Sequence, residues 1–141
     1  MMHFRLVSAK GTKFDGEAYE VLIPTRGGTI AVFENHMPLI SSASGGVVSV
    51  RAKASDRDTD MEQFAVSGGV MQIDGKNLTF LSDDITSSDE VNEKEAEAAL
   101  ARAQELIDNA TSRTQLHEAH RALHHSTAQL HIARIKRRRH P

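Results

Sequence analysis

The chain has 141 residues, the length of one ordinary domain or two small ones, which excludes a large multidomain enzyme. Hydrophobic residues make up 39% and charged residues 26%, a composition typical of folded globular proteins, and the formal charge of −2 is small. Without cysteine the chain can form neither a disulfide nor a thiolate metal centre. The start of the chain shows no cleavable targeting segment, and no apolar run is long enough to span a membrane.

The first part of the chain is organised in strand-length segments. Apolar positions in 19–23 and 29–33 flank the turn residues of 24–28, which predicts a hairpin, and Asp74-Gly75 predicts a second tight turn. We interpret Ser44-Gly45-Gly46 and Ser67-Gly68-Gly69 as breaks between further strands. Many short strands without a helical pattern between them predict an antiparallel sandwich or barrel.

The composition changes near residue 86. All nine glycines and all six aromatic residues lie at or before position 80, whereas the chain from Val91 onward is rich in Ala, Glu, Leu, Arg and His. Such a sequence favours uninterrupted helix. We therefore predict an α+β fold with an N-terminal antiparallel β-sandwich at 1–86 and a C-terminal antiparallel two-helix hairpin at 87–141.

Two capping signals predict where the helices begin. Ser87 with Glu90 places the first start near residue 88, and Ser112 with Gln115 places the second after a short turn at 109–112. Both helices carry an apolar seam of small and large residues. The expected seam positions are Val91, Ala99, Ala103, Leu106 and Ala110 in the first helix, and Leu116, Ala119, Leu123, Ser126, Leu130 and Ala133 in the second.

Charge supports the pairing of the two helices. Residues 89–108 carry seven acidic groups and two basic ones, whereas 109–141 carry seven basic groups and one acidic one. A core of leucine and alanine in a small hairpin buries little apolar surface. We therefore expect the packing of the hairpin to be conditional.

The histidines of the second helix do not form a recognisable catalytic motif. His117 begins a stretch similar to a zinc-protease helix, but Arg121 stands where the second histidine of that motif is required. His117, His120, His124 and His131 share one stripe, which could hold a metal only with a third ligand that the spacing does not supply. The alternative is a partly exposed flank whose charge rises as the pH falls. We predict no catalytic residue and no metal site.

Four stretches carry a resemblance to a known family: Phe14 to Glu17, Ile30 to Ile40 with its His36-Met37-Pro38-Leu39 core, Ser67 to Val70, and Asn77 to Asp83. They resemble the epsilon subunit of bacterial and plastid F-type ATP synthases. The resemblance implies a non-catalytic rotor protein in the central stalk. In that family the sandwich binds the gamma subunit on one side and the c-ring on the other, so that proton-driven rotation reaches the catalytic alpha/beta hexamer.

The resemblance also implies roles for particular residues. The loops that match the ring-facing loops of the family are Arg26, Gly27, Gly28 and Thr29, and Asn35, His36, Met37, Pro38 and Leu39. The family's hairpin folds against the sandwich or extends into the hexamer and inhibits ATP hydrolysis. Few first-helix acids lie near the basic end of the second helix, so we expect that end to be available to an acidic partner. The resemblance implies that this partner is the acidic C-terminal region of the beta subunits. Its residues are Arg134, Lys136, Arg137, Arg138 and Arg139.

Two further implications concern ligands and location. Some members bind regulatory ATP through an Ile/Leu-Asp-x-x-Arg-Ala motif, and the similar stretch at 117–122 makes Glu118 and Arg121 candidate nucleotide contacts. The implied location is the cytoplasmic face of the bacterial cell membrane, or less readily a plastid thylakoid, with membrane association only through the complex. The competing hypothesis is a small nucleic-acid-binding protein that uses the basic cluster, but interleaved aromatics and a reading motif are missing, so we expect no nucleic acid partner.

Overall fold

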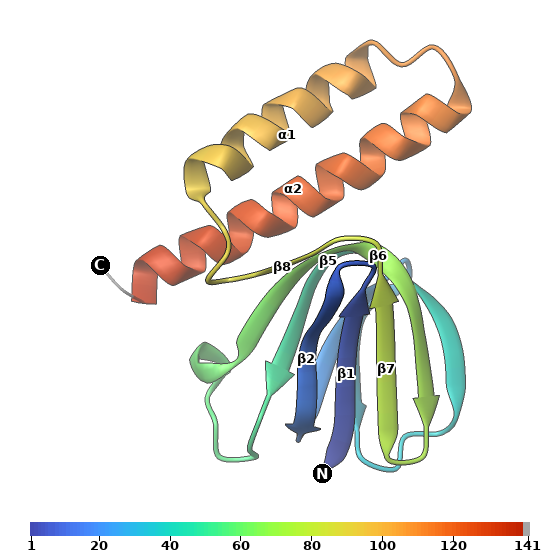
Figure 1. The fold of residues 1–141 in the computed structure, drawn as a ribbon, viewed down its shortest axis with the longest axis vertical. Coiled ribbons are helices and arrows are strands. Elements are labelled where there is room, and N and C mark those ends of the chain that lie inside the picture. Colours follow the sequence, from blue (N-terminus) through green and yellow to red (C-terminus); the bar gives the residue numbers. More distant parts are fainter. Residues whose placement is uncertain (140–141) are drawn as a thin grey trace.

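A computed structural model describes residues 1–139, apart from the side chain of Arg139. A β-sandwich forms one end of the molecule, and two antiparallel helices lie across the other end (Figure 1). The strands are β1 (Met2–Ser8), β2 (Gly11–Ala18), β3 (Glu20–Thr25), β4 (Gly28–Phe33), β5 (Leu39–Arg51), β6 (Glu62–Asp74), β7 (Asn77–Ser82) and β8 (Ile85–Ser87). A short 3₁₀ helix η1 (Asp58–Asp60) precedes β6, and the helices are α1 (Glu93–Asp108) and α2 (Arg113–Arg139).

The strands pair in the order β2-β1-β7-β6-β5-β3-β4, and β8 adds to β6. Neighbouring strands are antiparallel except β1 and β7, which run parallel. Alternate residues point inward and form the core. Its largest fully buried side chains include Phe4, Phe64, Phe80, Leu6, Ile23 and Met71. The predicted α+β class, with a sandwich followed by two helices, is confirmed.

The glycine pairs of β5 and β6 do not end strands, so our interpretation of them as breaks is wrong. Ala43 pairs with Gly69 and Gly45 pairs with Ser67, within two continuous strands of 13 residues each. Glycine is required at position 69, because its φ is 158° and a Cβ there would lie 1.9 Å from the carbonyl oxygen of Leu81. The glycines let both strands curve over the end of the sandwich without losing their pairing. We call residues 44–46 and 67–69 the glycine corner.

The first helix begins later than its sequence predicts. Asn92 is the N-cap, and its side chain accepts a hydrogen bond from the Glu95 backbone N–H at 3.2 Å. Ser87 instead belongs to β8, and the Glu90 carboxylate accepts a hydrogen bond from Lys13 Nζ at 2.9 Å. The expected start near residue 88 is therefore wrong, because strand pairing with β6 holds the segment extended.

The second helix begins where the sequence predicts, and it carries the contact with the sandwich. The Gln115 backbone N–H donates to Ser112 Oγ at 3.2 Å. On the sandwich side, Ala128 and Ile132 of α2 form a small buried cluster with Ala65, against which Val47 and Val91 pack. α2 therefore lies between the sandwich and α1 (Figure 1).

Part of the predicted helix seam is buried and part is not. The buried members include Ala103, Ala119, Ser126, Leu130 and Ala133. In contrast, Leu106 is 57% exposed and Leu116 is 38% exposed, although both were expected in the seam. Both lie near the turn that joins the helices, where the hairpin extends beyond the sandwich (Figure 1). Within residues 1–139, no helix is long and apolar enough to cross a membrane.

Candidate contact surfaces and the hairpin junction

The predicted loop at 35–39 forms an exposed corner between β4 and β5. Asn35 adopts a positive φ of 63°, and the His36 backbone N–H donates to the Phe33 carbonyl oxygen at 3.2 Å, which closes the turn. Pro38, which has no backbone N–H, directly precedes Leu39, where β5 begins. Met37 and Ile40 are each 72% exposed. Such exposed apolar side chains on a fixed turn are suited to contact with another protein.

The N-terminus lies beside this corner. The Met1 ammonium group donates to the Glu34 carboxylate at 2.8 Å, and this hydrogen bond with its charge lowers the pKa of Glu34. Lys76, in the β6–β7 turn, adds a smaller effect of the same sign. The N-terminus, the β6–β7 turn and the 35–39 corner therefore share the end of the sandwich that is remote from the helices.

The other predicted loop lies at the opposite end. Thr25 pairs with Gly28, so Arg26 and Gly27 form a two-residue turn between β3 and β4. Arg26 lines a cavity against α2 rather than a surface shared with the 35–39 corner. β4 runs from one loop to the other, so the two predicted contact loops lie at opposite ends of the sandwich and do not form one surface. Six strand residues separate loops by roughly 20 Å, a distance that strand geometry implies from the sequence alone.

An apolar patch on the outer face of the sandwich was missed by the sequence interpretation. Strand register places Val7, Leu81 and Val70 side by side, and Ile40 lies on the same face of the neighbouring strand. Val70 is 47% exposed and Leu81 is 52% exposed. The signal was present as apolar residues at outward positions of the strands, but which positions face outward depends on a register that the sequence leaves open.

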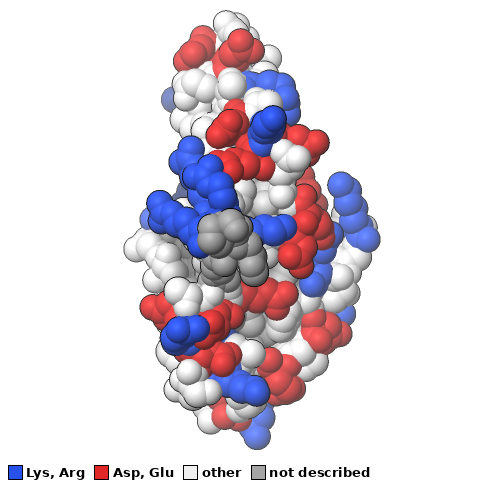
Figure 2. Space-filling view, turned by 90° about the vertical axis from the view of Figure 1, so that its left-hand side faces the viewer, with Lys and Arg blue, Asp and Glu red and all other residues white. Residues whose placement is uncertain are grey.

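The basic end of α2 is partly neutralised by α1. Arg137 Nη1 lies 3.0 Å from the Glu93 carboxylate, and Arg134 Nε lies 3.9 Å from it. Lys136 lines a cavity whose walls also include Glu62 and Asp89. Acidic and basic side chains accordingly alternate on the side of the molecule where α2 ends (Figure 2). One acid of the first helix, Glu93, thus serves both Arg134 and Arg137, while Arg138 is exposed and the side chain of Arg139 lies outside the described part.

The two candidate nucleotide residues meet at the junction of α2 and the sandwich. Glu118 and Arg121 line one cavity of about 450 Å³, together with Asp83 and Asp84. Arg121 Nη2 donates to the Asp83 carboxylate at 2.9 Å. His125 also lines this cavity, and its Nδ1 is buried without a hydrogen-bond partner among the described residues. Three carboxylates and one guanidinium could hold a triphosphate only if a divalent cation neutralised part of the negative charge.

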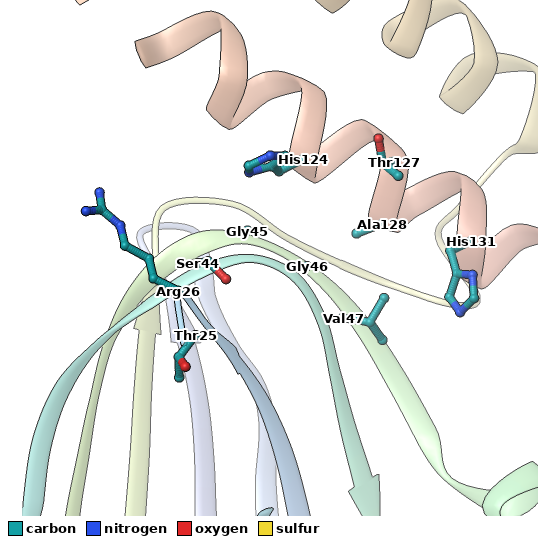
Figure 3. A pocket seen from close by; sticks show the side chains of 10 residues that line it. All are labelled: Thr25, Arg26, Ser44, Gly45, Gly46, Val47, His124, Thr127, Ala128 and His131. Carbon is teal, nitrogen blue, oxygen red and sulfur yellow. The ribbon is translucent and has the colours of Figure 1, made fainter. Parts of the chain in front are cut away.

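The histidine stripe of α2 faces the sandwich. His124 lines two adjoining cavities, His117 and His120 line one of them, and His131 lines the other (Figure 3). The rings of His120 and His124 lie 6.5 Å apart, measured between centroids. Among residues 1–139, no group of three histidine or carboxylate side chains is placed to hold a metal ion.

The fold and these surfaces define a class of protein that works through contacts: a β-sandwich with an exposed corner at one end and a helical hairpin docked on the other. Residues 1–88 match the family described as ATP synthase, Delta/Epsilon chain, beta-sandwich domain. The ATP synthase epsilon chain of Nitrosomonas eutropha is 30% identical over 141 residues, covering 99% of this chain and 98% of the relative. That of Laribacter hongkongensis is 31% identical, covering 98% and 96%.

The chain belongs to the delta/epsilon chain family of ATP synthase. It is a non-catalytic rotor subunit of the F-type enzyme, and the resemblance seen in its motifs is confirmed. Solved structures share the fold at low sequence identity. A chain of the Euglena gracilis mitochondrial ATP synthase has a TM-score of 0.72 at 15% identity and covers 90% of this chain and 78% of its own length. A chain in the structure of the central stalk and c-ring of the Tetrahymena thermophila mitochondrial ATP synthase has a TM-score of 0.63 at 12% identity and covers 92% of this chain and 96% of its own length.

Proposed function

We propose that the sandwich of this rotor subunit joins the gamma subunit and the c-ring, and that the hairpin inhibits ATP hydrolysis when it leaves the sandwich. The observation that carries this proposal is the separation of two cores. The sandwich core is closed without any helix residue, whereas the junction with α2 rests on Ala65, Ala128 and Ile132. The hairpin can therefore undock while the sandwich and its contacts stay folded.

The corner at Asn35, His36, Met37, Pro38 and Leu39 is the proposed c-ring contact. It lies at the end of the sandwich remote from the helices, and its apolar side chains are exposed. We leave Arg26 to Thr29 out of this contact, because that turn lies beside α2. The corner and the hairpin lie at opposite ends of the sandwich, which suits a subunit that contacts the ring at one end and extends its helices toward the catalytic hexamer at the other.

The outer apolar patch is the proposed gamma contact. Val70 and Leu81 lie on paired strands in the rigid part of the sandwich, beside Val7 and near Ile40. A stable protein interface needs such a desolvated centre with a polar rim. Replacing Leu81 by Asp should abolish co-purification with gamma, whereas the same change at the exposed β1–β2 turn residue Lys10 should leave it intact.

Coupling through the corner can be tested in membrane vesicles. Replacing His36 and Met37 by aspartates introduces charge into the proposed ring contact, and should weaken proton pumping driven by ATP hydrolysis while the sandwich stays folded. Lys10→Asp, at the opposite end, is the matched control. Unchanged pumping in the double variant would remove the ring contact from this corner.

The basic end of α2 is the proposed inhibitory contact, with the acidic C-terminal region of the beta subunits as its partner. Substituting Arg134, Lys136, Arg137, Arg138 and Arg139 by glutamine should raise the ATPase activity of the assembled complex, and added salt should do the same in the wild type. Glu93→Gln should have the opposite effect, because it releases Arg134 and Arg137 from their partner in the docked hairpin. Equal activity in all three proteins would show that this end is not the inhibitor.

The junction cavity of Glu118 and Arg121 is the proposed site for regulatory ATP, bound with Mg²⁺. The unpartnered Nδ1 of His125 in that cavity supports a ligand there. Isothermal titration of the full-length subunit with MgATP, repeated with Arg121→Gln, tests this assignment, and binding that Arg121→Gln leaves unchanged would contradict it. We place the whole assembly at the cytoplasmic face of a bacterial cell membrane, with this subunit held there only through the complex.

A further inference from the structure

A groove runs between α2 and the glycine corner. It consists of two adjoining cavities of about 580 and 440 Å³, which share Arg26, Ser44, Gly45 and His124 (Figure 3). The helix lies almost directly on the strand backbone here, since a Cβ on Gly45 would lie 3.0 Å from the Cβ of His124. The side chains of one helix face therefore meet a wall of peptide groups and hydroxyls.

Charge in this groove is of one sign. Arg26 enters from the β3–β4 turn, and the remaining ionisable lining residues come from α2: His117, His120, Arg121, His124 and His131. Within the described part of the chain, no carboxylate lines either cavity. β5 and β6 contribute the hydroxyls of Ser42, Ser44 and Ser67 and the backbone of the glycine corner. Asp83 approaches only from the side, where it pairs with Arg121 at 2.9 Å.

Arg26 is the residue of this groove that points most directly to an anionic ligand. Its side chain extends from the turn toward the side on which α2 lies, and its guanidinium lies to the left of His124 in this view (Figure 3). It makes no ion pair and no side-chain hydrogen bond with residues 1–139 of the chain. A planar guanidinium beside imidazoles and hydroxyls is the arrangement that recognises tetrahedral oxyanions, since all of these groups can donate hydrogen bonds to them.

We propose that this groove binds a phosphate-type oxyanion, inorganic phosphate or pyrophosphate, which fastens α2 to the sandwich. The anion bridges Arg26 on one part of the molecule and His120, Arg121 and His124 on the other. It therefore binds only when the hairpin is docked, and by linkage it stabilises the docked state. The groove shares Arg121 and Ser67 with the cavity of Glu118 but differs from it in charge, because carboxylates line that cavity and none lines the groove within the described residues.

Binding should strengthen as the pH falls. The groups that face the anion are the four histidines and Arg121 on α2 and Arg26 on the β3–β4 turn, while β5 and β6 contribute no titratable lining residue. The segment after β7 contributes Asp83, which pairs with Arg121 at the edge of the groove. Each histidine that takes up a proton adds a positive charge and so adds attraction for the anion. Without an anion, the same protonation places positive charges beside Arg26 and weakens docking. Anion binding and histidine protonation therefore both change the stability of the junction between α2 and the sandwich.

The binding is tested on the isolated full-length subunit by following backbone amide signals in NMR titrations at constant ionic strength. The probes are inorganic phosphate, pyrophosphate and sulfate. The charge of sulfate does not change between about pH 6 and pH 8, so any pH dependence of sulfate binding comes from the protein alone. We expect shifts centred on Ser44, Gly45 and Gly68, and affinity about tenfold higher near pH 6 than near pH 8. Shifts spread over all exposed basic residues would overturn the proposal as adventitious surface binding.

Matched variants locate the site. Arg26→Gln with His124→Asn should weaken pyrophosphate binding at least about tenfold. Arg113→Gln with His36→Asn removes the same two groups outside the groove and should leave the affinity unchanged. Equal weakening in both pairs, or shifts produced by MgATP but by none of the three inorganic anions, would overturn the proposal. The latter result would leave the nucleotide site standing, so the two failures are distinguishable.

The fastening effect has its own measurement. Hydrogen exchange of the α2 amides should slow when pyrophosphate is added to the wild type and should not change in the Arg26→Gln, His124→Asn pair. Exchange that slows equally in both proteins, or in neither, would overturn the role of the anion in docking.

Discussion

The sandwich and the hairpin are held together by different means. In the sandwich, aromatic and aliphatic side chains from every layer interlock, with Phe4, Phe64 and Phe80 fully buried among cross-strand neighbours. The hairpin has no aromatic residue, and in its part up to residue 138 only alanines, one serine and two larger aliphatic residues are buried. Buried area sets the hydrophobic contribution, so the sandwich is a folding unit and the hairpin is an attachment. A subunit that must keep one set of contacts while changing another needs this difference in stability between the sandwich and the docked hairpin.

The polar links repeat the contrast. Within the sandwich, Arg51 donates to the Glu20 carboxylate at 2.7 Å and to the Asp56 carbonyl oxygen at 2.6 Å, and its side chain is only 14% exposed. The ion pair that links the sandwich to α2, Arg121 with Asp83, is exposed. Exposed pairs contribute about 0–1 kcal/mol each and weaken in salt. The hairpin is therefore held by contacts that solvent conditions can shift.

Dividing the chain is the strongest test of this difference in stability. A fragment of residues 1–88 should unfold cooperatively in urea, because every strand and the main core lie within it. A peptide of residues 88–141 should lose most of its helical circular dichroism, because short helices without a large packed face are marginal. A non-cooperative 1–88 fragment would contradict the proposed division near residue 86.

Within the sandwich, the largest effect of a single methyl group is expected at Gly69. Gly69→Ala forces a Cβ against the Leu81 carbonyl and should reduce the free energy of unfolding by about 3–4 kcal/mol. Gly16→Ala is the matched control, since its Cβ would meet nothing closer than 3.8 Å. Urea denaturation of both variants measures the difference. Equal stability of the two would mean that the bend in β6 does not require glycine.

At the junction, Ile132 is the largest side chain in the small cluster and is 1% exposed. Ile132→Ala should cost about 2–4 kcal/mol, and the loss should appear as faster hydrogen exchange in α2 with little change in β1 and β7. Leu106→Ala, which truncates an exposed side chain of α1, should change the exchange by less than about 0.5 kcal/mol. Faster exchange throughout the sandwich would show that the two parts unfold together.

How much of this division the sequence predicts depends on the range of the interactions. The turn of Gly75, the cap of Ser112 and the order of sandwich and helices follow from local residue preferences. The glycine pairs gave the wrong interpretation because a Gly-Gly pair favours a turn locally, while pairing with distant strands keeps β5 and β6 continuous. The late start of α1 has the same cause, since β8 pairs with β6.

The functional surfaces show the same limit. The 35–39 corner was predictable because a single turn forms it. The groove of Arg26 was not, because its walls come from β3, β5, β6 and α2, which only the packed hairpin brings together. The presence of a basic cluster was predictable from the composition of the second helix. Its pairing with Glu93 was not, because it depends on which part of α2 lies beside the first residue of α1.

The smallest expected effect tests whether the linker before α1 belongs to the sandwich or to the hairpin. Lys13 of β2 hydrogen bonds to Glu90, and this contact lowers the pKa of Glu90, with a further contribution from Ser87. Because the folded chain favours the charged carboxylate, the contact stabilises the fold above the ordinary carboxyl range, and its contribution is lost as the pH falls through the lowered pKa. Glu90→Gln should therefore reduce the free energy of unfolding by about 0.2–1 kcal/mol at neutral pH and leave it unchanged in strong acid. Glu97→Gln is the control and should leave the free energy of unfolding unchanged at both pH values. If urea denaturation showed the same cost for Glu90→Gln at both pH values, the loss would come from packing rather than charge.

Hydrogen exchange of the Glu90→Gln variant shows to which part the linker belongs. If exchange became faster in α1 and α2 but not in β2, the linker would belong to the hairpin, and the part of the molecule that undocks would begin before Glu90 rather than after it.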